Sequence, residues 1–133
     1  MRAVFDANVL ISGFLWPEGA PGNLVSRWLV GEIELVVSDG LIADMQRALG
    51  RPKLRYRVTR DEESAIMTLL RTRATVAADP LEPARYSADP DDDYLVALAE
   101  AQRAVLVSGD RHLLELADRY PILSPRAFLT ELE

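Results

Sequence analysis

The sequence predicts a single α/β domain, residues 1–133, with a central parallel sheet of about four to five strands and helices on both faces. Two observations support this fold class: short apolar segments alternate with amphipathic helical segments, and several apolar segments end at a polar or acidic residue. The chain shows no internal repeat, no low-complexity segment and no long linker, and 49% of its residues are hydrophobic. This length and composition suit one compact soluble domain.

The predicted strands are short and apolar, as expected for strands buried on both faces. They comprise residues 2–6, 34–37, 74–78, 105–107 and 122–123, of which the last is very short. In a parallel sheet, the strands that end at Asp6, Val37 and Val107 should share one carboxyl edge, and ligands of open α/β sheets bind at that edge.

Capping signals place most of the predicted helices. Ser38 is a suitable N-cap for a helix to about Leu49, and Thr59 forms a capping box with Glu62 at the start of the next helix. Asp89, followed by Pro90, should cap a third helix. Further helices are predicted at 23–30, 111–118 and 125–132, and loops at 17–22 and 79–88.

Charge is unevenly distributed, although the net charge is −6. Six basic residues and no acid lie between Arg47 and Arg60, whereas four of the five residues from Asp89 to Asp93 are acids. The basic segment suits a phosphate polymer, or is an ordinary solvated loop. No apolar run approaches the ~20 residues of a membrane span, and the absence of cysteine fits a cytoplasmic protein.

Four aspartates are predicted to gather in one metal-binding pocket. Asp6 and Asp110 follow predicted strands, whereas Asp44 and Asp92 fall on the inner faces of predicted helices. Each has a simpler explanation, since Asp6 and Asp110 could be N-caps, Asp44 could be solvated, and Asp92 could favour a helix dipole. Gathered carboxylates repel one another, which should raise the pKa of at least one of them, and oxygen ligands favour Mg²⁺ or Mn²⁺.

Four ordered motifs make the chain resemble PIN-domain ribonucleases, in particular the small VapC-type toxins of prokaryotic toxin–antitoxin modules. The motifs are Phe5-Asp6-Ala7-Asn8-Val9-Leu10-Ile11-Ser12, Ser38-Asp39-Gly40-Leu41-Ile42-Ala43-Asp44, Asp89-Pro90-Asp91-Asp92-Asp93-Tyr94-Leu95-Val96-Ala97-Leu98-Ala99 and Leu106-Val107-Ser108-Gly109-Asp110. The resemblance implies a PIN-like fold and metal-dependent hydrolysis of RNA phosphodiester bonds by one or two Mg²⁺ or Mn²⁺ ions.

The resemblance also assigns residues. The catalytic and metal-binding acids are Asp6, Asp44, Asp92 and Asp110, and the supporting residues are Asn8, Ser38, Ser108, Asp89, Asp91 and Asp93. Asp89, Asp91 and Asp93 remain alternatives to Asp92 as the third acid. The family usually has a glutamate where this chain has Asp44, which retracts that carboxylate by one methylene. Arg51, Lys53 and Arg55 are candidates for binding phosphates, and Tyr56 for stacking on a base.

Partners follow from the same resemblance: an RNA substrate, a cognate antitoxin protein and a second copy of the chain in a homodimer. Trp16 is expected in the core or on a partner-binding surface. Two alternatives remain at this point. One is a PIN scaffold that binds RNA or protein without cutting, and the other is a phosphatase of the haloacid dehalogenase type, which would normally have an aspartate at the position of Asn8. A receiver-like domain is a weaker alternative, because it would require a lysine late in the chain.

Overall fold

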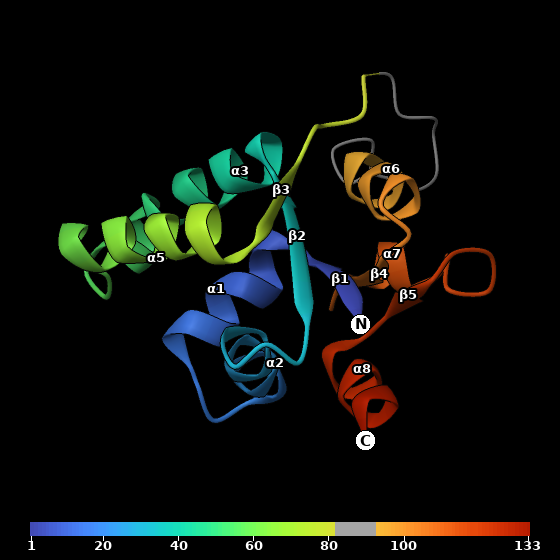
Figure 1. The fold of residues 1–133 in the computed structure, drawn as a ribbon. Coiled ribbons are helices and arrows are strands. Elements are labelled where there is room, and N and C mark those ends of the chain that lie inside the picture. Colours follow the sequence, from blue (N-terminus) through green and yellow to red (C-terminus); the bar gives the residue numbers. More distant parts are fainter. Residues whose placement is uncertain (82–92) are drawn as a thin grey trace.

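The computed structural model describes residues 1–81 and 93–133 and contains a five-stranded, entirely parallel sheet (Figure 1). Its strand order is β3-β2-β1-β4-β5, so β1 lies in the middle. The strands are β1 (Arg2–Phe5), β2 (Glu34–Ser38), β3 (Thr75–Ala77), β4 (Val105–Val107) and β5 (Ile122–Leu123). The predicted fold class is therefore confirmed, as is the shared carboxyl edge of β2, β1 and β4.

The topology reverses between β1 and β4. The chain proceeds outward from β1 through β2 to β3, and then returns to place β4 on the other side of β1. Phe5 pairs in register with Val107, so the residues that follow these strands emerge side by side. Such a switch point leaves a crevice at the carboxyl ends of the strands, where ligands of open α/β sheets bind.

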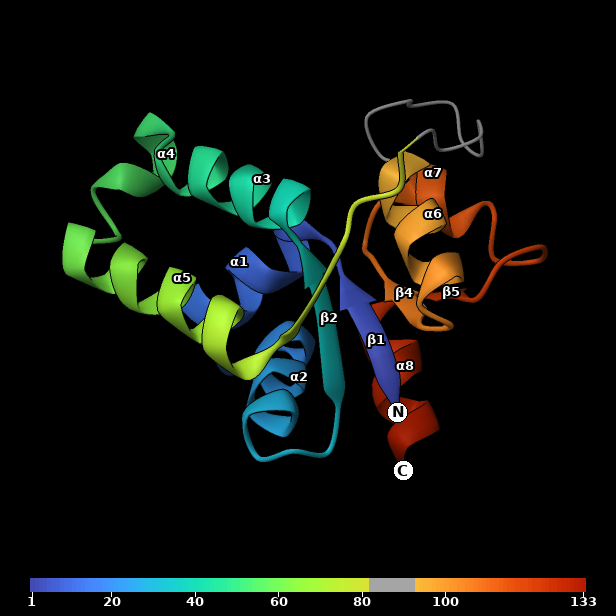
Figure 2. The ribbon, with the colours of Figure 1, turned by 45° about the horizontal axis from the view of Figure 1, so that its top comes forward.

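The helices between β1 and β3 form the larger part of the molecule (Figures 1 and 2). They are α1 (Ala7–Leu15), α2 (Ala20–Leu29), α3 (Asp39–Leu49), α4 (Pro52–Arg55) and α5 (Arg60–Arg73). The α3 helix begins at Ser38, whose hydroxyl accepts a hydrogen bond from the backbone N–H of Leu41 at 3.2 Å. The predicted capping box between Thr59 and Glu62 also forms, which confirms both predicted helix starts.

The second part of the chain adds α6 (Asp93–Ala101), α7 (Arg111–Leu114) and α8 (Pro125–Leu132). The α6 helix packs on β1 and β4, whereas α8 packs on α2 and β5. Phe5 and Phe128 meet edge to face with their ring centroids 6.4 Å apart, which joins the central strand to α8 in the core. No helix in the described ranges 1–81 and 93–133 is long and apolar enough to cross a membrane.

Several predicted boundaries were wrong. The predicted loop 17–22 contains the first residues of α2, which starts at Ala20. A Cβ on Gly22 would lie 2.3 Å from the carbonyl oxygen of Pro17, so glycine is needed for the helix to pack this closely on Pro17. The helices α1 and α4 were not predicted, and the helix predicted at 111–118 ends at Leu114. The predicted cap at Asp89 lies outside the described residues.

Candidate active site at the carboxyl edge of the sheet

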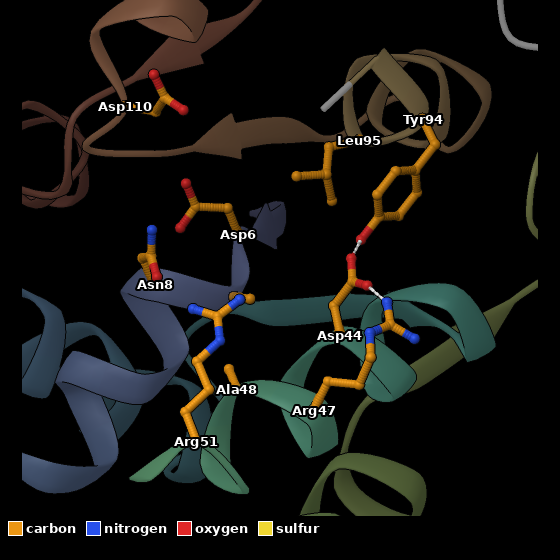
Figure 3. A pocket seen from close by; sticks show the side chains of 10 residues that line it. Asp6, Asn8, Asp44, Arg47, Ala48, Arg51, Tyr94, Leu95 and Asp110 are labelled. Carbon is orange, nitrogen blue, oxygen red and sulfur yellow. Dashed lines mark hydrogen bonds and ion pairs between the residues drawn. The ribbon is translucent and has the colours of Figure 1, made fainter. Parts of the chain in front are cut away.

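A polar pocket of about 500 Å³ opens at the carboxyl edge of the sheet (Figure 3). It lies above the switch point between β1 and β4, and α1, α3 and α6 supply the rest of its wall. Three of the four predicted metal-binding acids, Asp6, Asp44 and Asp110, line it together with the predicted supporting residue Asn8. Its remaining described lining residues are Ala7, Arg47, Ala48, Arg51, Tyr94 and Leu95.

Asp6 occupies the turn from β1 into α1. Its side chain caps α1 by accepting a hydrogen bond of 2.8 Å from the backbone N–H of Val9, and it accepts a second one from the hydroxyl of Ser108. The in-register pairing of β1 with β4 brings these two side chains together. Only 6% of Asp6 is exposed, so its carboxylate is fixed by neighbours rather than by water.

Ser108 and Asp110 form the matching turn after β4. The buried Ser108 hydroxyl also accepts a 2.9 Å hydrogen bond from the backbone N–H of Asp110, and Asp110 caps α7 through the backbone N–H of His112 at 2.8 Å. Ser108 thus connects the two acids, one through its side chain and the other through its backbone. The structure therefore places the Ser108 hydroxyl between the two acids, and its supporting role remains a prediction.

The pKa of the Asp6 carboxyl is raised above its usual 3.8. Burial is the largest cause, and the charge of Asp110 adds to it, while the hydrogen bonds from Ser108 and Val9 act in the opposite direction. The expected rise in a carboxyl pKa is therefore present, although burial contributes more than repulsion. A group with these properties gains from a nearby cation, because a cation offsets both the desolvation and the repulsion.

Asp44 faces the same pocket from the other side, in the middle of α3 (Figure 3). Its carboxylate accepts a hydrogen bond from the phenol of Tyr94 and forms an ion pair with Arg47 one turn along α3. About a third of its side chain is exposed. These two partners turn Asp44 toward α6, so it does not join Asp6 and Asp110 in this arrangement.

The donor chemistry of the pocket fits a hard divalent cation, since Asp6, Asp110 and Asn8 present carboxylate and amide oxygens. In residues 1–81 and 93–133, however, no three acids, histidines or cysteines are grouped closely enough to hold an ion. The candidates Asp89, Asp91 and Asp92 lie outside the described residues. Asp93, the remaining alternative for the third acid, is buried in the first turn of α6 and does not line the pocket.

The predicted phosphate-binding residues differ in their accessibility and in their existing contacts. Arg51 lines the pocket and extends its guanidinium toward the side on which Asp6 and Asn8 lie (Figure 3). Lys53 is exposed on α4. Arg55 instead pairs with Glu63 at 2.7 Å and donates to the carbonyl of Val58 at 2.7 Å. Arg55 therefore secures the chain between α4 and α5, and a phosphate would have to compete with these contacts.

Sequence reasoning missed the two polar lining residues Arg47 and Tyr94 of the pocket. Arg47 stands three residues after Asp44, a spacing at which helical side chains meet, so this ion pair could have been inferred. The contact of Tyr94 joins residues 50 positions apart and had no signal in the sequence beyond its place next to the acidic run. Ser38, a predicted supporting residue, caps α3 and does not line the pocket.

A family model described as PIN domain matches residues 2–112, and the chain belongs to this family. The match includes all four motifs and all of the candidate site residues. PIN domains are generally nucleases, and such nucleases generally use divalent metal ions. The family match therefore favours a nuclease over the haloacid dehalogenase and receiver alternatives.

Similar proteins support the same fold. Uncharacterized protein MJ1680 of Methanocaldococcus jannaschii is 25% identical over 145 residues, which cover 100% of this chain and 92% of that protein. The structure of VapBC2 from Rickettsia felis, bound to a DNA fragment from their promoter, matches with a TM-score of 0.62 and 12% identity over 93% of this chain and 98% of that one. The PIN domain endonuclease Utp24 matches with a TM-score of 0.56 and 20% identity, over 92% and 84%.

Proposed function

We propose that this protein is a Mg²⁺- or Mn²⁺-dependent endoribonuclease. The observation that carries the proposal is the convergence of Asp6 and Asp110 at the switch point of a PIN-domain sheet, where both line one polar pocket with Asn8. The likeness in fold to Utp24, a PIN domain endonuclease, is consistent with it. RNA as the substrate comes from the resemblance of the four motifs to PIN-domain ribonucleases.

In this proposal Asp6 and Asp110 hold the metal, and Asp44 and Asp92 complete the set of acids. A bound Mg²⁺ or Mn²⁺ would activate water and offset the negative charge of the phosphate. Ser108 and the backbone N–H of Val9 orient the Asp6 carboxylate before a metal binds. Arg51 is placed to bind a phosphate of the substrate beside the acids.

Asp44 needs a change of side-chain conformation to take part in this metal site. To reach a cation beside Asp6, the Asp44 carboxylate has to leave the phenol of Tyr94 and the guanidinium of Arg47. The proposed nuclease therefore uses Asp44 in a second arrangement of its side chain. If Asp44 stays with Tyr94 and Arg47, the strand-end acids hold the metal without it and cleavage is weaker, and complete loss of cleavage would leave the PIN scaffold that the sequence also allowed.

Cleavage of labelled single-stranded RNA by the purified chain tests the proposal. We expect cleavage with Mg²⁺ or Mn²⁺, none with a chelator, and none from Asp6→Asn. Asp118→Asn is the matched control, because Asp118 is exposed and lies outside the pocket. Binding of RNA without metal-dependent cleavage would instead support the scaffold, and cleavage that survives Asp6→Asn would point to a contaminating nuclease.

We further propose that the nuclease is the toxin of a toxin–antitoxin module, acting in the cytoplasm as a homodimer and restrained by an antitoxin. The support is the VapC-type motif pattern and the likeness in fold to VapBC2. Induced expression in a bacterial host should then arrest growth, and Asp6→Asn should relieve the arrest. Coexpression of a small protein encoded beside the gene should relieve it as well. Growth unaffected by the unaltered chain would contradict the toxin role but not the nuclease activity.

A further inference from the structure

An exposed cluster of two aromatic rings and one arginine lies outside the pocket. The guanidinium of Arg57 lies 5.8 Å from the ring centroid of Trp16 and 5.5 Å from that of Tyr56. Both distances are within the range of a cation–π contact. Trp16 is 44% exposed and Tyr56 is 76% exposed, so each leaves much of its ring to solvent. We call these three residues the aromatic cluster.

The backbone on both sides of the aromatic cluster is held in place. Trp16 ends α1 with its backbone N–H bonded to the carbonyl of Ser12 at 2.9 Å, and the following Pro17 packs closely on Gly22. On the other side, Val58 is buried in the core. The Arg55 contacts with Glu63 and Val58 described above further secure this turn. The exposed rings are therefore presented by fixed backbone and not by a loose loop.

The aromatic cluster is connected to the pocket by basic residues. Arg51 lines the pocket, Lys53 is exposed on α4, and Arg57 is itself part of the cluster. The length of α1 indicates how far the aromatic cluster lies from the pocket. Ala7 and Asn8 line the pocket at the start of this helix, and Trp16 follows its end, about 12 Å from Asn8 along the helix axis. No acid interrupts the sequence from Arg47 to Arg60. Along the sequence, the charged residues from the pocket's Arg51 to Arg57 in the cluster are thus all basic.

We propose that the aromatic cluster is a subsite that stacks unpaired bases of the RNA substrate, on one side of the bond to be cut. Exposed aromatic rings combined with arginine and a basic path to the metal site match the way single-stranded nucleic acid is bound, by stacking and backbone charge. The faces of paired bases are covered by their neighbours in a duplex, so this subsite requires single-stranded RNA or an unpaired loop. The inference rests on the proposed ribonuclease function and adds a base-stacking subsite, formed by Trp16 and Tyr56, outside the pocket.

The basic path favours nucleic acid over a protein partner. An apolar partner surface would bury the two rings but would gain nothing from Arg51 and Lys53. In this proposal, a phosphate chain that leaves the pocket at Arg51 passes Lys53 before its bases reach the rings. A second copy of the chain, or another protein, is the alternative that the experiment has to separate.

The experiment measures binding of oligoribonucleotides of increasing length by the full chain in the presence of a chelator, which prevents cleavage. Binding should tighten once the oligonucleotide is long enough to reach from the pocket to the aromatic cluster. Binding of such an oligonucleotide should also quench the fluorescence of Trp16. The other tryptophan, Trp28, is buried and bonded to the carbonyl of Arg73, so it should respond little. Trp16→Ala and Tyr56→Ala should each weaken binding of the longer RNA by about 5- to 150-fold, the range of one lost base–aromatic stack.

An abasic nucleotide at the position that reaches the aromatic cluster provides the sharper comparison. It should weaken binding by the unaltered chain and have little further effect on Trp16→Ala, because the stack is already absent. Arg126→Ala is the control for a surface substitution outside the aromatic cluster, since Arg126 is exposed on α8. Tyr56→Ala keeps the test valid if Trp16→Ala does not fold, because Tyr56 is even more exposed.

The outcomes separate this inference from the proposed function. If the RNA is cleaved but neither its length nor the variants of the aromatic cluster affect binding, the subsite is refuted and the ribonuclease stands. If Trp16→Ala changes the oligomeric state in sizing experiments and leaves RNA affinity unaltered, the cluster is a protein contact and the subsite is also refuted. If the unaltered chain binds no RNA of any length and also cleaves none with Mg²⁺ or Mn²⁺, both proposals fail. Length-dependent binding that is lost with the rings would support the subsite even in a chain that does not cleave.

Discussion

The two sides of the pocket hold their acids in different ways. On the strand side, Asp6 and Asp110 receive hydrogen bonds from backbone N–H groups, and Ser108 links them. On the helix side, Asp44 is held by two side chains, the phenol of Tyr94 and the guanidinium of Arg47. On the strand side, Asp6 and Ser108 are buried and Asp110 is half-buried, and all three are held by local hydrogen bonds, whereas the helix side depends on side chains that can turn.

The difference also concerns charge. Among the residues that the structure describes, no basic side chain forms an ion pair with Asp6 or Asp110, whereas Asp44 has Arg47. A carboxylate without a basic partner is stabilised by a bound cation. A carboxylate that is already paired with an arginine is stabilised less by an additional cation. We therefore expect most of the metal affinity to come from the strand side, with Asp44 contributing after it gives up its present partners.

The largest expected effect is on the rate of RNA cleavage, which should depend more on an acid of the strand side than on Asp44 of the helix side. Asp110→Asn should reduce metal-dependent cleavage by more than about 100-fold, while Asp44→Asn should reduce it by about 10- to 100-fold, the range for residues that act around a metal ion. Asparagine can still cap α7 at position 110, so the fold should persist. Initial cleavage rates at saturating metal would check both values. If Asp44→Asn proved the more damaging change, the helix side would be the main metal site and the comparison would be reversed.

A smaller effect is expected when the link within the strand side is removed. Ser108→Ala takes away the hydroxyl that donates to Asp6 and accepts from the backbone N–H of Asp110. Cleavage should fall by about tenfold, at the lower end of what residues behind a metal ligand contribute. Ser124→Ala is the control, because it also removes a helix-capping serine, at a typical stability cost of about 1 kcal/mol, but at α8 and away from the pocket. Equal losses in both variants would show that stability alone explains the effect.

The strand side was largely predictable from sequence. An apolar run that stops at an acid, as at Asp6 and Asp110, fixes both the strand and the position of the carboxylate, because parallel strands end at one edge. The caps at Ser38 and Thr59 were predictable for a similar reason, since their hydrogen bonds reach only three residues along the chain. Local hydrogen bonds and strand ends leave a pattern in the sequence, and these features could be inferred from it.

The helix side was predictable only in part. The position of Asp44 on α3 was inferred from helical spacing, but the direction of its carboxylate is set by Tyr94, which reaches it from α6 after 50 residues of intervening chain. The α1 helix was missed because its sequence is apolar around most of its circumference, so no polar face marks it. The aromatic cluster is similar: Trp16 and Arg57 meet only through the packing of α1 beside the segment that joins α4 to α5.

A smaller effect, on metal affinity, should show how strongly the present partners of Asp44 hold its carboxylate away from the metal site. Tyr94→Phe removes the phenol that donates to Asp44 and keeps the ring in place. If Asp44 joins the metal in the active arrangement, Mn²⁺ binding should tighten by a few-fold to about tenfold, because one hydrogen bond to a charged group no longer has to be broken. Calorimetric titration with Mn²⁺ would measure it. Weaker binding in Tyr94→Phe would show instead that Asp44 supports the site from where it now lies.

The smallest expected effect is on stability and concerns the charge of Asp6. Its folded-state pKa lies above the usual 3.8, so the folded protein binds this proton more tightly than the unfolded chain does. Ionised Asp6 therefore lowers the stability of the fold as the pH rises from about 3.8 through the folded-state pKa, and the loss is constant above it. Asp6→Asn keeps an oxygen for the backbone N–H of Val9 and removes the buried charge.

In the presence of a chelator, Asp6→Asn should melt a few degrees above the unaltered protein at neutral pH, and this difference should shrink toward zero as the pH is lowered toward 3.8. Thermal unfolding followed by circular dichroism over that pH range would measure it, with Asp118→Asn as a control in which the charge is exposed. Added Mn²⁺ should reverse the order, because the metal stabilises only the chain that keeps the carboxylate. A variant that melts lower at neutral pH without metal would mean that the hydrogen bonds to Asp6 outweigh its desolvation, and the strand side would then be stable without any cation.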